Sequence, residues 1–341
     1  MSTCSRHGFA LVAALVLTAG SAMGVVIGGG VIADLEPSNN TVLGAATFLD
    51  ALQSGAIIGI ASLASDSFDH FGAVLPDNGV LTVMTVPLGS GPSPLSSPNT
   101  TLKVTNFDGS SEYVINDDAG TDQSGSNPNG VGSVARCSFT SAGKYVFRVS
   151  GSVLGGTGQY AVLASVYMPG AQDWQEQEAN NGPAVAVPLG LSLGGPTIGT
   201  GNLSPGGDVD HYSVEMRRGD ILAAVTTPLG GYPQTLNTPD TVLEIVGTNG
   251  ATVLCSNDDA GTDQTDGNTR GSAVRFRAPA DGKYFIKVRG FNISATGLYS
   301  LTAAVIPPPA GTDCAADLNG DGQINTQDLV QFLNVFGNVC P

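Results

Sequence analysis

The chain has 341 residues, of which 12% are charged and 47 are glycine, and its net charge is -16. This length has room for two globular domains and a small additional segment. Scarce charge with abundant Gly, Ser, Thr and Asn favours short strands over helical bundles. The acidic balance disfavours a nucleic-acid or anionic-membrane surface and leaves divalent cations as partners.

The first residues predict export. Arg6 precedes an apolar run from Phe9 to Ala19, and small residues follow up to Gly24. A basic start, a short apolar core and a small-residue cleavage site are typical of a secretory signal peptide, here residues 1–24. The alternative is an uncleaved membrane anchor, which the glycines in and after this segment disfavour. We expect a protein that is secreted, extracellular or at the cell surface, with no membrane span after cleavage.

Export places the cysteines beyond the signal peptide in an oxidising compartment. Cys314 and Cys340 bracket the C-terminal segment, and we expect them to form a disulfide. Cys137 and Cys255 occupy different places in the two repeats described below, where the other copy has an apolar residue. The apolar counterparts favour two buried thiols, and a Cys137–Cys255 bridge is the alternative.

An octapeptide occurs twice and divides the chain. The sequence N-D-D-A-G-T-D-Q occupies residues 116–123 and again residues 257–264. Its flanks repeat in the same order; for example, Gly143-Lys144-Tyr145 corresponds to Gly282-Lys283-Tyr284. A whole module is therefore duplicated. We place copy one at residues 34–168 and copy two at residues 173–306.

Copy two reads as an antiparallel β-sandwich. Short apolar and β-branched runs are separated by Gly, Pro, Asn and Asp, which is the pattern of sandwich strands. Alternation in the run after Gly282 puts Tyr284, Ile286 and Val288 on one inner face. Copy one repeats this set with Tyr145, Phe147 and Val149. The predicted strands of copy two are His211–Met216, Ile221–Thr226, Thr241–Val246, Thr252–Cys255, Ser272–Arg277, Lys283–Arg289 and Leu298–Val305.

A series of short motifs has the same order in both copies. In copy two these motifs are Glu178 to Asn181, Asp208 to Tyr212, Thr241 to Leu243, Asn257 to Asp259, Asp281 to Tyr284 and Gly297 to Tyr299. In copy one they fall at residues 36–40, 66–71, 116–118, 142–145 and 158–160. Each copy thereby resembles the bacterial pre-peptidase C-terminal (PPC) domain, a small β-sandwich appended to many secreted proteins. The resemblance implies a mainly β fold with two tandem antiparallel, jelly-roll-like sandwiches.

The segment that leads into copy two carries a cluster of oxygen ligands. Hard oxygen ligands at alternating spacing, followed by a second pair of carboxylates, suit Ca²⁺. Collagen-binding relatives of the PPC family hold Ca²⁺ with a matching linker, so the resemblance implies a calcium site here. The alternative is that these side chains cap backbone amides at turns and strand edges. The predicted ligands are Glu176, Glu178, Asn180, Asn181, Asp208 and Asp210.

Three other polar features are weaker candidates for a site. Copy one departs from the calcium pattern, because Asp34 replaces the first Glu and the spacing of Asp66 and Asp69 is wider. The Asn-Asp-Asp turn of each octapeptide favours a structural Asx-turn over a ligand site. His70 and His211 each follow an aspartate and lead into an apolar strand, which favours a strand-edge role over catalysis.

A proline-rich linker, residues 307–313, leads to a calcium-loop motif at residues 317–328. Oxygen-bearing residues fill the ligand positions, and Gly322 allows the sharp turn. Leu329, Phe332 and Phe336 then share one face of a short predicted helix. Residues 314–341 resemble a single dockerin repeat, whereas a complete dockerin has two, and the resemblance implies a calcium-bound attachment segment. The predicted ligands are Asp317, Asn319, Asp321, Gln323, Asn325 and Asp328.

Two classes of function fit this organisation. The first is a secreted, non-catalytic binding or scaffolding protein whose tail attaches it to an extracellular or cell-envelope protein or polysaccharide. The alternative is an accessory or catalytic component of extracellular polysaccharide or protein degradation, for example a glycoside hydrolase with paired carboxylates. The acidic residues lie in duplicated turns rather than in one unique cleft, and accessory-type modules occupy the chain. We therefore predict no catalytic residues, no enzyme and Ca²⁺ as the cofactor.

Overall fold

The structure is a computed structural model. It describes residues 55–63, 68–89, 95–122, 130–152, 156–168, 173–191, 195–230, 236–264 and 270–307, residue 326, and the backbone of strands at 26–27 and 47–49. Strands dominate these ranges, so the mainly β sandwich fold is confirmed. In the described part of the chain, no helix is long and apolar enough to cross a membrane. The predicted signal peptide, Cys314, Cys340 and the six predicted ligands of the tail lie outside the described residues.

Copy one is built from two facing sheets. The first has the order β1 (Val26–Ile27), β3 (Gly55–Leu63), β11 (Gly158–Tyr167), β5 (Val80–Pro87), β9 (Val134–Ser138) and β19 (Thr262–Asp263). The second has the order β2 (Thr47–Leu49), β4 (Phe68–Leu75), β10 (Gly143–Gly151), β6 (Thr100–Asn106) and β7 (Glu112–Asn116). The long neighbours pair antiparallel, as expected for a sandwich.

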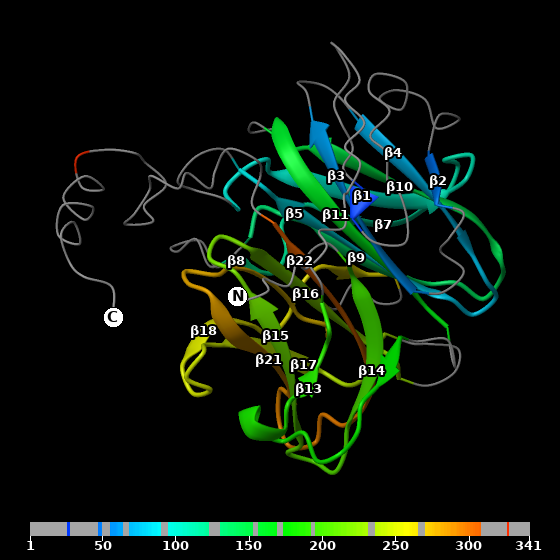
Figure 1. Ribbon diagram of the computed structural model, residues 1–341. Helices are drawn as coiled ribbons and strands as arrows, with labels where there is room; N and C mark the ends of the chain where they lie inside the picture. Colours follow the sequence, from blue (N-terminus) through cyan, green and yellow to red (C-terminus); the bar gives the residue numbers. More distant parts are fainter. Residues whose placement is uncertain are drawn as a thin grey trace, which may run out of the picture.

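Copy two repeats this order strand for strand. Its strands, coloured from green to orange, lie below the blue-to-green strands of copy one in Figure 1. Its first sheet has the order β12 (Trp174–Gln175), β14 (Thr197–Leu203), β22 (Gly297–Ile306), β16 (Ile221–Pro228), β20 (Ala273–Arg277) and β8 (Thr121–Asp122). Its second has the order β13 (Val187–Pro188), β15 (Val209–Met216), β21 (Gly282–Gly290), β17 (Thr241–Val246) and β18 (Val253–Asn257). A 3-10 turn, η2 (Pro183–Val185), lies between β12 and β13.

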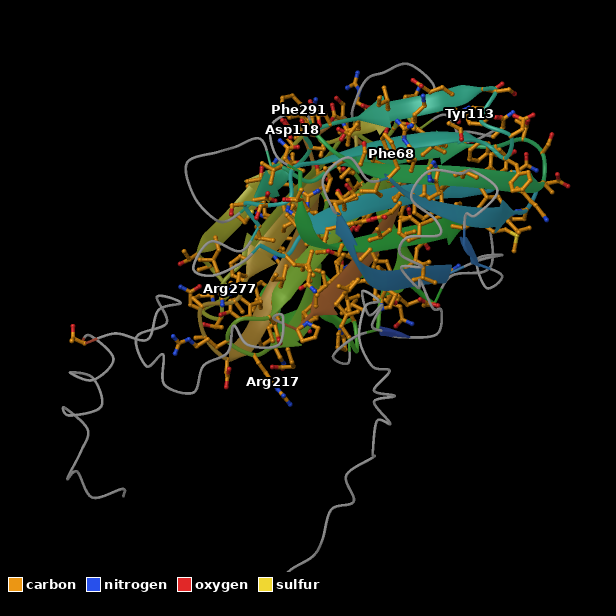
Figure 2. All side chains as sticks on the ribbon, turned by 90° about the horizontal axis from the view of Figure 1, so that it is seen from above. Phe68, Tyr113, Asp118, Arg217, Arg277 and Phe291 are labelled. Atoms are coloured by element: carbon orange, nitrogen blue, oxygen red, sulfur yellow. The ribbon has the colours of Figure 1, made fainter. Side chains whose placement is uncertain are left out.

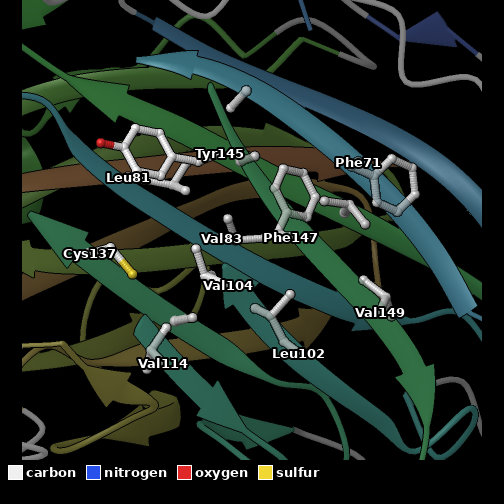
Figure 3. Close-up of a cluster of buried hydrophobic side chains, with 14 of the residues drawn as sticks. Phe71, Leu81, Val83, Leu102, Val104, Val114, Cys137, Tyr145, Phe147 and Val149 are labelled. Carbon is white, nitrogen blue, oxygen red and sulfur yellow. The ribbon is translucent and has the colours of Figure 1, made fainter. Parts of the chain in front are cut away.

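Each sandwich has an apolar core of its own. Alternating residues of facing strands fill it, and the core of copy one contains no residue of copy two, or the reverse. Figure 3 shows this packing in copy one, where the ring of Phe71 stacks on that of Phe147 with centroids 5.2 Å apart. The predicted inner residues of β10 and β21, three in each strand, are all buried. Burial of these side chains from water is the main term that stabilises each sandwich.

The two cysteines of the sandwiches are free, buried thiols, as predicted. Cys137 points into the core of copy one (Figure 3). Cys255 lies in the core of copy two, and its Sγ is 3.6 Å from the carbonyl oxygen of Thr121. Burial raises the pKa of Cys137 well above its ordinary value and that of Cys255 to about 12, so both remain protonated and unreactive.

Strand β14 was not predicted, because its sequence T-I-G-T-G-N-L contains two glycines and no alternation. The glycines are required by aromatic rings of neighbouring strands. A Cβ atom on Gly199 would lie 2.0 Å from the ring of Trp174, and one on Gly201 would lie 2.3 Å from the ring of Tyr299. Tertiary packing thus overrides the low strand propensity of glycine. The strands predicted in copy two all occur, with their ends shifted by one or two residues at most sites.

The octapeptides join the two copies by exchanging short strands. The Thr-Asp pair of the first octapeptide is β8, which pairs parallel with β20 of copy two, and the pair of the second is β19, which pairs parallel with β9 of copy one. The glycine before each pair has positive φ, 81° at Gly120 and 87° at Gly261. A Cβ atom there would lie 2.7 Å from the carbonyl oxygen of Ala273 or 2.5 Å from that of Val134. Only glycine permits this approach.

A reciprocal pair of buried arginines completes the contact. The Nε of Arg136 in copy one donates to the Thr226 carbonyl at 3.0 Å, and its Nη1 lies 3.3 Å from Oδ1 of Asp263. In copy two, the Nε of Arg275 donates to the Thr85 carbonyl at 2.8 Å, and its Nη1 lies 3.1 Å from Oδ1 of Asp122. Both guanidinium groups are fully buried, whereas Arg217 projects from the outside of the molecule (Figure 2). The two copies are therefore related by an approximate two-fold axis.

Candidate metal centre

Two strands bring the predicted carboxylates of copy two together. Strand β12 pairs parallel with the edge of β14, and this register places Glu176 beside residues 200–202. The amide of Glu176 donates to the Thr200 carbonyl at 2.8 Å, and its Oε2 accepts from the Asn202 amide at 2.6 Å. Asp210 comes from β15 in the opposite sheet, where alternation points it inward with Tyr212. Residues far apart in sequence thereby meet at one end of the sandwich.

Three carboxyl groups form a cluster at this end. One carboxylate oxygen each of Glu176, Glu178 and Asp210 lies within 4.8 Å of the others. Asp210 is completely buried and Glu178 is exposed, so the cluster reaches from the interior to the surface. Oε1 of Glu176 and Oδ1 of Asp210 are buried and have no hydrogen-bond partner. A buried oxygen without a partner is costly, and either a proton shared between the two carboxyl groups or a bound cation would satisfy these two.

A tyrosine pair holds Asp210 from behind. The hydroxyl of Tyr299 donates to Oδ2 of Asp210 at 2.6 Å, and the hydroxyls of Tyr212 and Tyr299 are themselves 2.6 Å apart. Burial and the adjacent carboxyl group of Glu176 raise the pKa of Asp210 to about 9. Burial and the charges of Asp208 and Glu176 also raise the pKa of Glu178. At neutral pH the cluster therefore takes up either protons or a cation.

The other three predicted ligands have different surroundings. Asp208 caps backbone amides, since its Oδ2 accepts from Ser204 at 3.0 Å and its Oδ1 from Val209 at 2.9 Å, which agrees with the alternative role given above. Asn180 is buried, its carbonyl accepts from the His211 amide at 3.0 Å, and its side-chain amide has no hydrogen-bond partner. Asn181 is exposed. Asn180, rather than Asn181, is therefore the asparagine whose buried side-chain atoms are available to a ligand.

The donor set fits a hard divalent cation. Among the described residues, the two groups of potential metal ligands contain carboxylates only, without His or Cys. Ca²⁺ binds carboxylate and neutral oxygen donors, whereas Zn²⁺ and copper favour imidazole and thiolate. A cation at the cluster would offset the repulsion between Glu176 and Asp210 and would satisfy the buried oxygens.

The second carboxylate group lies at the octapeptide turn of copy two. Asp240, Asp258 and Asp259 have oxygens within 4.8 Å of one another. Burial and neighbouring carboxylates raise the pKa of Asp258 and of Asp259. Nη1 of Arg270 lies 2.7 Å from Oδ2 of Asp240, so a cation is already present. This group is the weaker candidate for a metal site, and Ser272 fixes its turn by donating to the Asp258 carbonyl.

Copy one has a simpler arrangement at the corresponding place. Asp69 is fully buried on β4, and the hydroxyl of Tyr160 donates to its Oδ2 at 2.6 Å. Phe71 stands where copy two has Tyr212, so the second hydroxyl is missing. Asp34 and Asp66 lie outside the described residues. His70 and His211, for which a strand-edge role was expected, are buried within β4 and β15.

No family model matches the chain, and no curated protein matches its sequence. The structure is similar to the periplasmic g-type lysozyme inhibitor PliG of Aeromonas hydrophila, with 20% identity over 35% of this chain and 95% of that chain, at a TM-score of 0.25. The PPC domain of a Bacillus anthracis collagenase gives 20% identity over 35% and 93%, also at 0.25. Tandem CBM51 modules of a Streptococcus pneumoniae family 98 glycoside hydrolase give 12% identity over 73% and 84%, at 0.20.

Proposed function

We propose that the protein is a secreted, non-catalytic binding protein whose copy two holds a Ca²⁺ ion through Glu176, Glu178, Asn180 and Asp210. The observation that carries this proposal is the pair of buried oxygens without partners, Oε1 of Glu176 and Oδ1 of Asp210, in one cluster of carboxylates. The PPC-like motif order of both copies is the reason to place the protein among binding modules.

The ion would act on structure rather than on a reaction. It supplies positive charge that allows the clustered carboxyl groups to ionise together. Glu176 and Asn180 belong to the segment that leads into copy two, and Asp210 belongs to the core strand β15. Bridging them fixes this segment, including η2, against the sandwich. Calcium binding would thus set the shape of the surface at this end of copy two.

Terbium luminescence tests the site, because Tb³⁺ replaces Ca²⁺ at oxygen sites and is excited through a nearby indole. Trp174 is the only tryptophan in the chain, and its ring lies 5.0 Å from that of Tyr212 beside the cluster. We expect a saturable Tb³⁺ emission that decreases when Ca²⁺ is added, because Ca²⁺ displaces Tb³⁺ from the site. Asp210→Asn and Glu176→Gln keep the side-chain shapes and should weaken the affinity by roughly tenfold or more, because charge count sets calcium affinity.

Asp259→Asn is the matched control, because it removes one carboxylate from the other acidic group. It should leave the emission unchanged. Emission of wild-type strength in Asp210→Asn, or an equal loss in Asp259→Asn, would place the ion elsewhere and refute the site.

We further propose that the tail, residues 314–341, binds a second Ca²⁺ and attaches the protein to an envelope or extracellular partner. The ligand register of Asp317, Asn319 and Asp321 supports this proposal. The tail contains neither Trp nor Tyr, so its site is silent in the terbium assay. Calorimetry of the full chain should therefore give two calcium sites, and Asp321→Ala should remove one while the terbium emission remains. An oxidised 310–341 peptide should gain helix on addition of Ca²⁺; no change in its circular dichroism would refute the tail site.

A further inference from the structure

The contact between the two copies contains a symmetric set of bonds and an asymmetric set. The symmetric set comprises the exchanged strands and the two buried arginines, for which each copy supplies the same residue type at the same position. Between these bonds lies an apolar layer from the outer faces of both first sheets, with Met84, Leu163 and Ala161 from copy one and Ile221, Ala304 and Ile306 from copy two. These side chains from both copies are buried in the layer.

Two hydroxyl pairs cross this apolar layer and break the symmetry. The hydroxyls of Thr82 and Thr227 lie 2.7 Å apart, and those of Ser165 and Thr302 lie 2.8 Å apart. All four side chains are buried, with exposed fractions of 3%, 1%, 1% and 1% respectively. Each pair joins copy one to copy two, so each hydroxyl has a partner in the other copy.

The positions related to these pairs by the two-fold axis are apolar. Aligning the two copies makes Val86 of copy one equivalent to Thr227 of copy two, and Thr82 equivalent to Ala223. The alignment is fixed because β5 and β16 both run into the sequence Pro-Leu-Gly. In the same way, Leu163 aligns with Thr302 and Ala304 with Ser165. Val86, Ala223, Leu163 and Ala304 all belong to the buried apolar layer. The contact therefore has polar pairs on one side of the axis and apolar pairs on the other.

We propose that this surface is a pairing surface that selects copy one as the partner of copy two and disfavours two like copies. If two copies of the second module met through the same two-fold contact, Thr227 would face Ala223 and Thr302 would face Ala304. Two copies of the first module would put Thr82 against Val86 and Ser165 against Leu163. Either like pair buries four hydroxyls without partners, while its arginine bonds and exchanged strands remain possible. Unpaired buried hydroxyls are costly, so they reject the like pair.

The partner of copy two is thus copy one of the same chain. The symmetric bonds supply affinity for any copy of the module, and the two hydroxyl pairs supply the choice among copies. Each unpaired buried hydroxyl lowers an association constant by about tenfold, so the four in a like pair should lower it by about ten-thousandfold.

A nicked chain tests the proposal without isolating either half. A site for a specific protease replaces residues 169–172, and the full chain is folded before it is cut. We expect the two halves to remain together as one 1:1 species in size-exclusion chromatography with light scattering. Thr227→Val with Thr302→Leu gives copy two the residues that copy one has at these positions. This double variant leaves Thr82 and Ser165 without partners, so the halves should separate at a roughly hundredfold higher concentration on dilution.

Rescue distinguishes pairing from general damage. Adding Thr82→Ala and Ser165→Ala to that double variant recreates the apolar pairs found across the axis, Ala with Val and Ala with Leu. The fourfold variant should restore the association to within about tenfold of the wild type. Thr248→Val, at an exposed turn outside the contact, is the control and should change nothing. Unchanged association in the double variant, or no recovery in the fourfold variant, would overturn the proposal.

A second measurement examines the like pair itself. Each copy has a core that contains only its own residues, so the halves are separated in urea and refolded singly. The copy-two half should be monomeric at concentrations where it pairs with copy one. The half with Thr227→Val and Thr302→Leu should form a dimer, because its two-fold contact then contains only apolar pairs. A wild-type half that dimerises as tightly as it pairs with copy one would refute the selection.

Discussion

The residues of copy one and copy two are equivalent at the contact between the copies. They differ at the end of the sandwich where copy two has its carboxylate cluster. At the contact, Arg136 and Arg275 make the same set of bonds, and the octapeptides are identical. At the acidic end, copy two has Tyr212 hydrogen bonded to Tyr299, whereas copy one has Phe71 packed on Phe147. A two-fold contact places both octapeptides in the same surroundings, so both need the same residues. Phe71 and Tyr212 lie in the cores of their own sandwiches rather than in the contact, so the contact does not require them to be equal.

The largest predicted effect concerns the buried arginines at the shared contact. Arg136→Met or Arg275→Met leaves a buried aspartate without its cation, and we expect each to lower the free energy of unfolding by about 3–5 kcal/mol. The two losses should be similar, because the surroundings of the two arginines are equivalent. Urea unfolding followed by circular dichroism measures both.

The double variant Arg275→Met with Asp122→Leu is the control for that prediction, since it removes both charges. It should recover much of the loss. Burial already raises the pKa of Asp122, so the Arg275→Met variant should also be less impaired in acid, where this carboxyl group takes up a proton. Clearly unequal losses from the two arginines would contradict the two-fold equivalence of the contact.

An intermediate effect is expected from pH at the acidic end of copy two. In the metal-free protein the pKa of Asp210 is about 9, far above the ordinary value of about 3.9 for aspartate. Between these values the folded protein binds a proton that the unfolded chain releases, so its stability falls as pH rises. At the proposed calcium site the ion would displace that proton, and its stabilising effect should therefore grow with pH. Urea midpoints in chelator and in Ca²⁺, at about pH 5 and about pH 8, measure the difference.

Asp210→Asn should remove most of this dependence, because the amide does not titrate. Stability in chelator that rises from about pH 5 to about pH 8 would contradict the raised pKa of Asp210. The same scan with Asp69→Asn reports on copy one, in which Tyr160 holds the buried carboxyl group.

The smallest effect is expected from exchanging the residues that distinguish the two ends. Tyr212→Phe removes the hydrogen bond to Tyr299 and should cost about 0.5–1.5 kcal/mol of stability, with a weaker terbium signal. Phe71→Tyr adds a hydroxyl beside Tyr160 and should change stability by less than about 1 kcal/mol without creating a metal site. A loss of several kcal/mol in Tyr212→Phe would show that the tyrosine pair, rather than the ion, organises this end.

Much of each sandwich could be predicted from the sequence, because strand periodicity is a local property. Tyr284, Ile286 and Val288 alternate with charged residues except at Phe285, and alternation decides which side of a half-buried strand faces the core. The candidate ligands Glu176 and Asp210 also stood out, since carboxylates cluster at a recognisable spacing. Their meeting depends on the parallel pairing of the two-residue strand β12 with β14, and so short a strand has no period to detect.

The contact between the copies was decided by tertiary structure alone. Arginine usually faces water, and a buried arginine needs a partner of opposite charge. Arg136 finds Asp263 and Arg275 finds Asp122, in each case in the other copy. One local signal existed: β5 and β16 contain no charged residue and are buried on both faces along their whole length. A strand's own sequence specifies that it must be covered. The covering partner is selected by bonds between residues far apart in the chain, because hydroxyl pairs such as Thr82 with Thr227 exist only once both sandwiches have formed and met.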